Sequence, residues 1–198
     1  MRNVWLWSAA SACAASAAVI GCGPAGEGPV IAGRHASDLA RRLAHPVATV
    51  RVEAASLLIA AGPAAKPLAP ALRTAADDEN SLVRLRAAAA LARIDPEERA
   101  FAIETLLGHL RKPDDKSRHI SAAMALAELG PDAAPAVPLL TALLGSADWE
   151  ERVWGARALG RIGEAARPSL PAIKARLADR VGQVRRNAEE SIALLEQK

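Results

Sequence analysis

Aromatic residues are scarce in this chain of 198 residues: they make up 3% of it, tyrosine is absent and there is one phenylalanine. The chain is nevertheless 51% hydrophobic. An aromatic core is therefore excluded, and the core must be built from Ala, Leu, Val and Ile. Cysteine is also rare, with Cys13 and Cys22 as the two thiols, so a framework of disulfides is excluded as well.

Residues that commonly carry catalysis or bind metals are few. The four histidines are His35, His45, His109 and His119. None of them precedes Glu, and no two lie four residues apart, which is the spacing of a zinc site on a helix. We find no glycine-rich phosphate loop and no plausible Ser/His/Asp set. We therefore expect no catalytic residue, no metal and no cofactor, and a chain that is not an enzyme.

One phrase recurs along the chain, and "SLVRLRAAAALARIDP" (residues 81–96) is one copy of it. Counted from the arginine, the copies begin at Arg51, Arg84, His119, Arg152 and Arg185, with spacings of 33, 35, 33 and 33 residues. Each has Ala or Gly three residues later and Leu or Ile seven residues later, and these positions share one face of an α-helix. A fixed period of this length indicates a solenoid. The small residue would let a neighbouring helix approach to about 8 Å.

A second helix follows in each unit. The first helix, helix A, is expected to end at residues such as Gly62-Pro63, because Gly caps a helix and Pro cannot continue it. A Pro-x-x-Pro pair then predicts the start of the second helix, helix B, since prolines fit a first turn. These pairs are Pro67/Pro70, Pro135/Pro138 and Pro168/Pro171.

Both ends of the array can be recognised. A lone helix B is expected over residues 37–45, capped by Ser37 or Asp38. The last helix A has Glu189 where other units have Ala, which predicts a polar outer face that ends the stack. The fold class is therefore all-α: an α-solenoid, or superhelix of antiparallel helix pairs, with about ten helices.

The N-terminus has a different character. Residues 1–21 combine a basic Arg2, an apolar stretch and small residues near the end, which is the layout of a signal peptide. The residues from Val19 to Cys22 resemble a bacterial lipobox. That resemblance implies removal of residues 1–21 and lipid attachment to Cys22. Ordinary signal cleavage and an uncleaved anchor are the alternatives.

These features divide the chain into three parts. Residues 1–21 are expected to be the signal peptide, residues 22–33 a lipid-anchored flexible tether rich in Gly and Pro, and residues 34–198 the repeat solenoid. The mature chain would then keep Cys22 alone, with no internal disulfide. Its location would be the bacterial cell envelope, as an exported, membrane-anchored lipoprotein.

The repeated phrase reads VRxxAAxAL, followed by IGP, P and L. It resembles the HEAT-like repeat of the armadillo-type superfamily, in particular the short version named after phycobilisome lyase subunits. The resemblance covers roughly residues 37–198, and it implies that B helices line a concave face and A helices a convex one. It says little about function, because such repeats serve scaffolds, adaptors, lyase subunits and hydroxylases. We interpret acidic residues before the helix A arginines, such as Asp78 and Asp148, as helix caps and partners in ion pairs between repeats.

Two features depart from the repeat and are candidate partner-binding sites. Trp149 and Trp154 stand where other units mostly have small or polar residues, and Trp is common at interface hot spots. Alternatively, both rings cover a neighbouring loop and fill a gap. The second feature is charge: the stretch from Arg152 to Arg186 has nine basic and two acidic residues, a net charge of +7. Arg152, Arg157 and Arg161 are its candidates, and a solvated face with local ion pairs is the alternative.

These observations favour a non-catalytic protein–protein interaction or scaffold module, tethered to the cell envelope. Its expected partners are another protein and, through the N-terminal lipid, a membrane; nucleic acid is not expected for an exported chain, and the protein is expected to be a monomer. One alternative, from the resemblance alone, is an accessory subunit of a lyase- or hydroxylase-like enzyme. Another is a binder of anionic surfaces through the basic stretch of residues 152–186.

Overall fold

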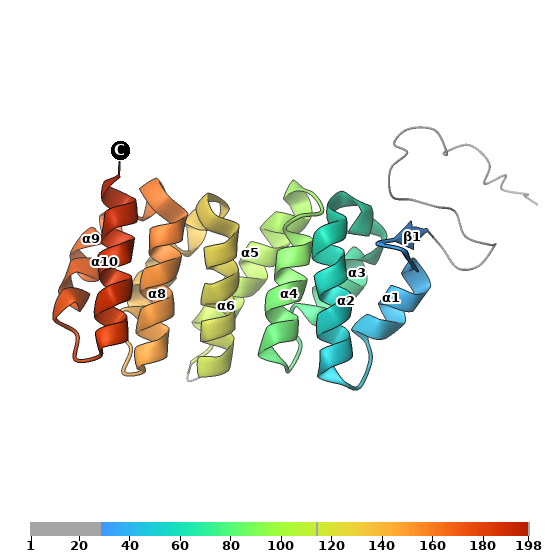
Figure 1. Ribbon diagram of the computed structural model, residues 1–198, viewed down its shortest axis with the longest axis horizontal. Coiled ribbons are helices and arrows are strands. Elements are labelled where there is room, and N and C mark those ends of the chain that lie inside the picture. The colour runs from blue at the N-terminus through green and yellow to red at the C-terminus, as the bar shows by residue number, and fades with distance from the viewer. Residues whose placement is uncertain (1–28, 114, 198) are drawn as a thin grey trace, which may run out of the picture.

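The computed structural model describes residues 29–113 and 115–197. The helices stand side by side in two rows (Figure 1). One row contains the A helices α2 (Ala48–Ala61), α4 (Ser81–Leu91), α6 (Lys116–Leu129), α8 (Trp149–Ile162) and α10 (Gly182–Glu196). The other contains the B helices α1 (Ala36–Leu43), α3 (Ala69–Ala75), α5 (Pro96–Arg111), α7 (Val137–Leu143) and α9 (Leu170–Lys174). The predicted all-α solenoid is confirmed, with ten α-helices among the described residues.

Three B helices are preceded by a 3-10 segment. These segments are η1 (Gly62–Leu68), η2 (Gly130–Ala136) and η3 (Gly163–Ser169), and a fourth, η4 (Ala175–Ala178), follows α9. Each of the first three begins at a glycine with a positive φ, which is 54° at Gly62, so the chain turns there in a conformation that favours glycine. Pro67 lies inside η1 and Pro70 in the first turn of α3. The proline pair therefore spans the passage from 3-10 to α-helix, and α3 itself starts later than Pro67.

The folded body begins before the expected boundary at residue 34. A short antiparallel pair of strands, β1 (Val30–Ile31) and β2 (Arg34–His35), precedes α1. The side chain of Ile31 is fully buried in the core of the first units. Residues 29–33 thus belong to the folded body rather than to the tether. The predicted signal peptide and Cys22 lie outside the described residues.

Polar side chains cap several helices. The N-cap side chains of α4, α5, α6 and α8 accept hydrogen bonds from N–H groups of the first turn; they are Asn80, Asp95, Asp115 and Asp148. The interpretation of Asp148 as a cap is confirmed. Helix α1 is different, because it begins at Ala36 and its N-cap residue, His35, makes no capping hydrogen bond. The cap predicted at Ser37 or Asp38 is therefore wrong, since both residues lie inside the helix.

Small residues bring the helices into close contact. A Cβ built on Gly155 of α8 would lie 3.0 Å from the carbonyl oxygen of Leu140 in α7, which confirms the role predicted for this position. The contact between α8 and α10 is closer still, because a Cβ on Gly160 would lie 2.9 Å from the Cα of Ser191. Gly160 was not among the positions that the repeat singled out.

The two rows differ in packing. Neighbouring A helices pack directly against each other along the whole row, whereas neighbouring B helices contact one another much less. Part of this difference follows from length, because α1, α3, α7 and α9 are shorter than every A helix. The concave face that the family resemblance implied for the B helices stays a prediction.

Two clusters of buried Ala, Leu, Ile and Val side chains fill the space between the rows, as the composition predicts. The run Ala48–Ala75 is long and apolar enough to cross a membrane by length and composition. It changes direction at Gly62, however, and Leu58 and Leu72 within it are fully buried. Burial in this core accounts for the hydropathy of the run.

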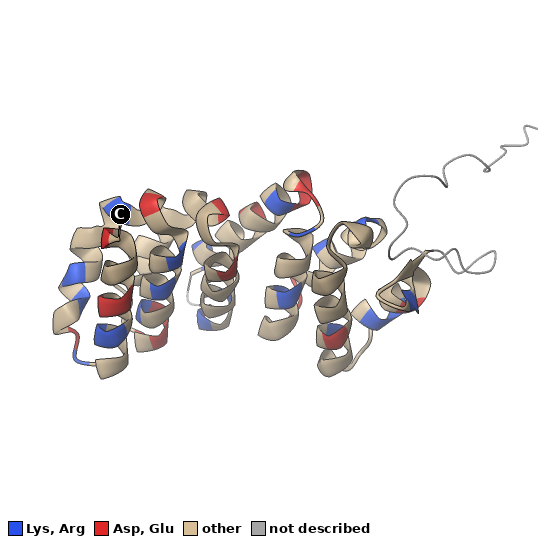
Figure 2. Cartoon of the chain, turned by 45° about the horizontal axis from the view of Figure 1, so that its top comes forward, with Lys and Arg blue, Asp and Glu red and all other residues tan. Residues whose placement is uncertain are grey.

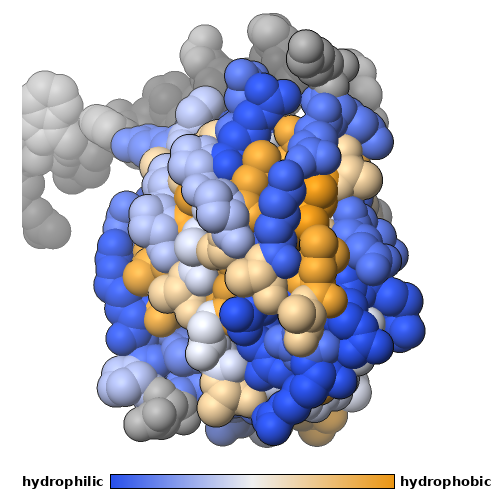
Figure 3. Space-filling view, turned by 90° about the vertical axis from the view of Figure 1, so that its left-hand side faces the viewer, coloured by the Kyte–Doolittle hydropathy of each residue, from blue (hydrophilic) through white to orange (hydrophobic). Residues whose placement is uncertain are grey.

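The C-terminal end of the stack is only partly polar. Glu189 of α10 is exposed, as predicted. Leu177 and Leu194 are exposed as well, with 41% and 46% of their surface accessible. Figure 3 shows hydrophobic side chains between hydrophilic ones on this end of the molecule.

Candidate functional site

The arginines that begin three of the five repeated phrases are structural residues. Arg51, Arg84 and Arg152 are 7%, 1% and 4% exposed. Each donates from Nη1 to two backbone carbonyls five and six residues earlier; for Arg152 these belong to Ala147 and Ser146, at 3.0 and 2.9 Å. The guanidinium thereby satisfies carbonyls in the loop that leads from helix B to the next helix A.

Two of these arginines also form ion pairs with the following unit. Arg51 lies 2.8 Å from Asp78, and Arg152 lies 2.8 Å from Asp179. The hydrogen bond from Arg152 keeps the pKa of Asp179 below its ordinary value. These pairs confirm the predicted ion pairs between repeats. They also correct the expectation for Arg152, which is buried and paired and so cannot meet a partner at the surface.

A polar cluster around a buried histidine joins three units of sequence. His109 of α5 is 3% exposed, and its Nε2 lies 3.2 Å from the carboxylate of Asp77. Arg118 of α6 forms an ion pair with the same carboxylate and faces the imidazole. Burial, followed by the charge of Arg118, lowers the pKa of His109. Across the described ranges, no group of three His, Cys, Asp or Glu residues could hold a metal ion.

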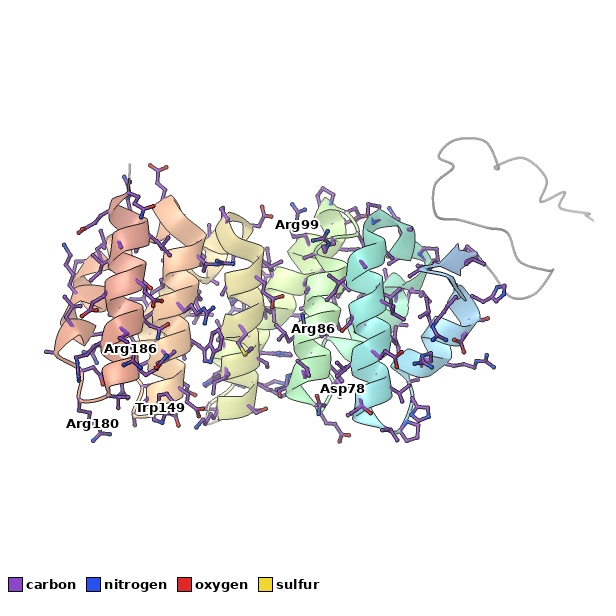
Figure 4. All side chains as sticks on the ribbon, viewed as in Figure 1. Asp78, Arg86, Arg99, Trp149, Arg180 and Arg186 are labelled. Carbon is purple, nitrogen blue, oxygen red and sulfur yellow. The ribbon has the colours of Figure 1, made fainter. Side chains whose placement is uncertain are left out.

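The two tryptophans lie in different surroundings. Trp149 is the first residue of α8 and is 43% exposed (Figure 4). Trp154 is half-buried and packs against the core. It lines a groove of about 190 Å³ between α6 and α8, together with Met124 and Glu128. The rings therefore do not form one joint site, and Trp154 is the one that lies in a groove.

Two exposed arginines of α8 adjoin this groove. Arg157 and Arg161 both line it, and the guanidinium carbon of Arg157 lies 5.1 Å from the centroid of the Trp154 ring. The same arginines line a second groove of about 370 Å³ between α8 and α10, to which α10 contributes Arg186 and Glu190. The two grooves thus meet along α8. We call them together the A-face groove.

The basic stretch does not form a single face. The last units carry more basic than acidic residues (Figure 2), but several of these cations are already engaged. Lys174 pairs with Glu196, and Arg167 donates to the carbonyl of Leu195. In contrast, no ion pair links Arg157 or Arg161 to a carboxylate of the described residues. Arg186 donates to the side chain of Gln183, which is neutral.

The sequence indicated part of this site and missed the rest. Trp154, Arg157 and Arg161 were singled out, and the structure brings them together on α8. Met124 and Arg186 come from neighbouring A helices; Met124 was not singled out, and Arg186 was counted only as the end of the basic stretch. A signal for Met124 existed, because it stands five residues after His119, as Arg157 stands five after Arg152.

The two rows of antiparallel helices and the repeated arginine of helix A define an α-solenoid repeat protein of the HEAT and armadillo type. A family model for HEAT repeats matches residues 36–127 and 103–193. The chain therefore belongs to the HEAT repeat family. No curated protein matches it.

Solved structures of engineered repeat proteins share the fold. A designed armadillo repeat protein, solved in complex with the peptide (KR)4, has a TM-score of 0.57 and 19% identity, over 79% of this chain and 80% of that one. An engineered protein from a structural genomics consortium has a TM-score of 0.55 and 24% identity, over 81% and 78%. Another from the same consortium has a TM-score of 0.55 and 26% identity, over 80% of each chain.

Proposed function

We propose that this chain is a non-catalytic interaction module that presents the A-face groove to another protein. The observation that carries the proposal is the contrast among the arginines. The first three junction arginines, Arg51, Arg84 and Arg152, are buried and hydrogen-bonded. Arg157 and Arg161, in contrast, are exposed beside a half-buried tryptophan and lack an ion pair with any described carboxylate. Arg and Trp are enriched where binding energy concentrates at interfaces.

The form of the molecule supports this use. In a solenoid each repeat contacts its neighbours only, so one side of every A helix remains available along the stack. The designed armadillo neighbour was solved with a peptide bound. It supports the idea that a stack of this type can hold an extended chain.

The second part of the proposal concerns location. We infer that the module is exported and held at the membrane of the bacterial cell envelope through lipid on Cys22. The support is the sequence alone: a basic Arg2, an apolar stretch, and the lipobox-like residues from Val19 to Cys22. The module would then act as a stiff arm on a short tether.

The binding proposal is tested by affinity capture from detergent-solubilised envelope. The intact protein is compared with Arg157→Glu/Arg161→Glu and with a control, Arg86→Glu/Arg93→Glu. Arg93 stands nine residues after Arg84, as Arg161 stands nine after Arg152, so the control changes the same charge on α4 and in the turn that follows it. We expect loss of specific partners with the first variant only. Equal capture by all three proteins would contradict the proposal.

The anchoring proposal is tested by the mass of the mature protein expressed in a bacterium. Cys22→Ser is compared with Cys13→Ser, which alters the chain's other cysteine. We expect the intact protein and Cys13→Ser to carry a lipid mass at a new N-terminus and Cys22→Ser to lack it. An unmodified Cys22 in the intact protein would refute lipid anchoring.

A further inference from the structure

The A-face groove gathers exposed arginine side chains from α8 and α10. Three guanidinium groups line it, from Arg157, Arg161 and Arg186, and two carboxylates, from Glu128 and Glu190. None of the three guanidiniums forms an ion pair with either carboxylate. Elsewhere in the stack, exposed arginines occur both with a carboxylate partner, such as Arg73 with Glu98 at 2.8 Å, and without one among the described residues, such as Arg93. The groove therefore keeps donor capacity for an anion from outside.

The groove also has an apolar part. Met124 and the half-buried ring of Trp154 line the α6–α8 section, and Leu194 lines the α8–α10 section. The stacking of Arg157 on Trp154 orients the guanidinium before any partner arrives, and a stacked guanidinium still offers its N–H edge to a carboxylate. A ligand with both negative and apolar groups would satisfy both parts at once.

The spacing of the helices favours an extended chain. Packed helix axes lie about 8–10 Å apart, and an extended peptide rises about 3.3 Å per residue, so side chains two positions apart, which point to the same side, lie roughly 7 Å apart. A peptide that crosses α6, α8 and α10 could thus place an apolar side chain in one section and a carboxylate in the next. A layer of lipid headgroups has no group that would enter the α6–α8 section.

From these observations we infer that the A-face groove binds an acidic, extended peptide segment of a partner protein. Its carboxylates would pair with Arg157, Arg161 and Arg186, in the two-pronged geometry that guanidinium and carboxylate favour. An apolar side chain of the peptide would pack against Trp154 and Met124. This inference rests on the proposed function and specifies the chemistry of the partner.

The test uses purified protein and labelled synthetic peptides in fluorescence anisotropy. The probe is a peptide with the core Glu-Glu-Val-Val-Glu-Glu-Val, flanked by Gly-Ser, in which residues two positions apart, on the same side of an extended chain, are always one Glu and one Val. A Gln-for-Glu peptide, a Ser-for-Val peptide and vesicles containing phosphatidylglycerol are compared with it. We expect the Glu/Val peptide to bind in about 50 mM salt and weaken as salt rises. The Gln peptide should bind at least tenfold more weakly, the Ser peptide several-fold more weakly, and the vesicles should show no preference over neutral ones.

Protein variants separate the groove from general charge. Arg157→Glu/Arg161→Glu should weaken binding of the Glu/Val peptide at least tenfold, Trp154→Ala several-fold, and Arg86→Glu/Arg93→Glu less than twofold. Circular dichroism checks that each variant folds. If the double variant does not fold, Arg161→Glu alone replaces it. The side chain of Arg161 makes no hydrogen bond or ion pair with another described residue, so its replacement breaks none.

Several outcomes would overturn the inference. They are absence of peptide binding at low salt, equal losses in both double variants, a Ser peptide that binds as well as the Val peptide, or charge-dependent binding to anionic vesicles in place of the peptide. The proposed function is judged separately by the capture from envelope. If that capture depends on Arg157 and Arg161 while the acidic peptide fails, the partner chemistry is wrong and the interaction module stands; if both fail, both fall.

Discussion

Replacing Gly160 by alanine tests whether a small residue is what lets α8 and α10 touch. The added Cβ would lie 2.8 Å from Oγ and 2.9 Å from both Cα and Cβ of Ser191. The hydroxyl of Ser191 is also held in place, because its Oγ lies 2.8 Å from the carbonyl oxygen of Ala156 and 2.7 Å from that of Asn187 and can donate to either. Rotation of the serine side chain would leave the clash with its Cα, so α10 itself must move.

The magnitude follows from two opposing effects. Alanine is favoured over glycine in a helix interior by about 0.8–1.0 kcal/mol, whereas overpacking a core costs roughly 1–3 kcal/mol. Gly108 of α5 is the matched control, because a Cβ there would meet no heavy atom within 4 Å. Gly108→Ala should therefore raise the free energy of unfolding by about 0.5–1 kcal/mol. The free energy of unfolding of Gly160→Ala should be lower than that of Gly108→Ala by about 1–3 kcal/mol.

The measurement is urea unfolding followed by circular dichroism, with the midpoint and the slope m determined for each variant. An unchanged m indicates that a shift of the midpoint reports stability rather than a change in the unfolding process. If Gly160→Ala stabilises the protein as much as Gly108→Ala does, there is room between α8 and α10. The reasoning from close helix contact would then be refuted.

Three further predictions concern buried polar groups and the tryptophans. Arg152→Met should lower the free energy of unfolding by about 3–5 kcal/mol, because it removes the close cation of the buried Asp179 carboxylate, leaves only Arg176 at 3.8 Å, and frees two loop carbonyls. Urea unfolding measures this, and a loss below about 1 kcal/mol would contradict it. Burial lowers the pKa of His109 in the folded protein. The unfolded chain therefore binds a proton on this imidazole more readily than the folded protein does. The stability that the neutral, buried imidazole contributes is present above the unfolded pKa of about 6.5 and is lost as the pH falls below it. The melting temperature should therefore fall between about pH 7.5 and pH 5.5, and His109→Gln should reduce that fall; an unchanged slope would exclude His109 as its cause. Trp154→Ala should lower the free energy of unfolding by about 1–3 kcal/mol, because the ring packs on the core, and the exposed Trp149→Ala by less than about 0.5 kcal/mol; equal effects would show that the rings share one environment.

Some of the candidate site could be read from the sequence because the repeat supplies a reference. Trp154 was noticeable only by comparison with the same position in other units, whereas Arg157 was singled out through the charge of its stretch. The comparison does not help for Arg152, because most junctions also have an arginine at this position. Since Arg152 begins the basic stretch, it was interpreted as an exposed charge. Its ion-pair partner, Asp179, lies 27 residues later in the chain. The spacing of residues on one helix cannot reveal a partner at that distance.

The start of the fold was misplaced for a related reason. Residues 30–35 contain no helical periodicity and several small residues, so they were assigned partly to a tether. The pairing of β1 with β2 and the burial of Ile31 depend on contact with the first helices. Such contacts leave no local pattern in two strands of two residues each.

The sequence by itself determined the period of the stack, the order of the helices and the small residues where they meet. These properties are local and are repeated five times, so the noise of any single copy is averaged out. The tertiary structure alone decided which row is the more tightly packed, which arginines are buried in ion pairs, and which remain exposed beside Trp154. The charge of an arginine is the same everywhere in the chain, but its availability depends on whether a carboxylate from the next unit reaches it.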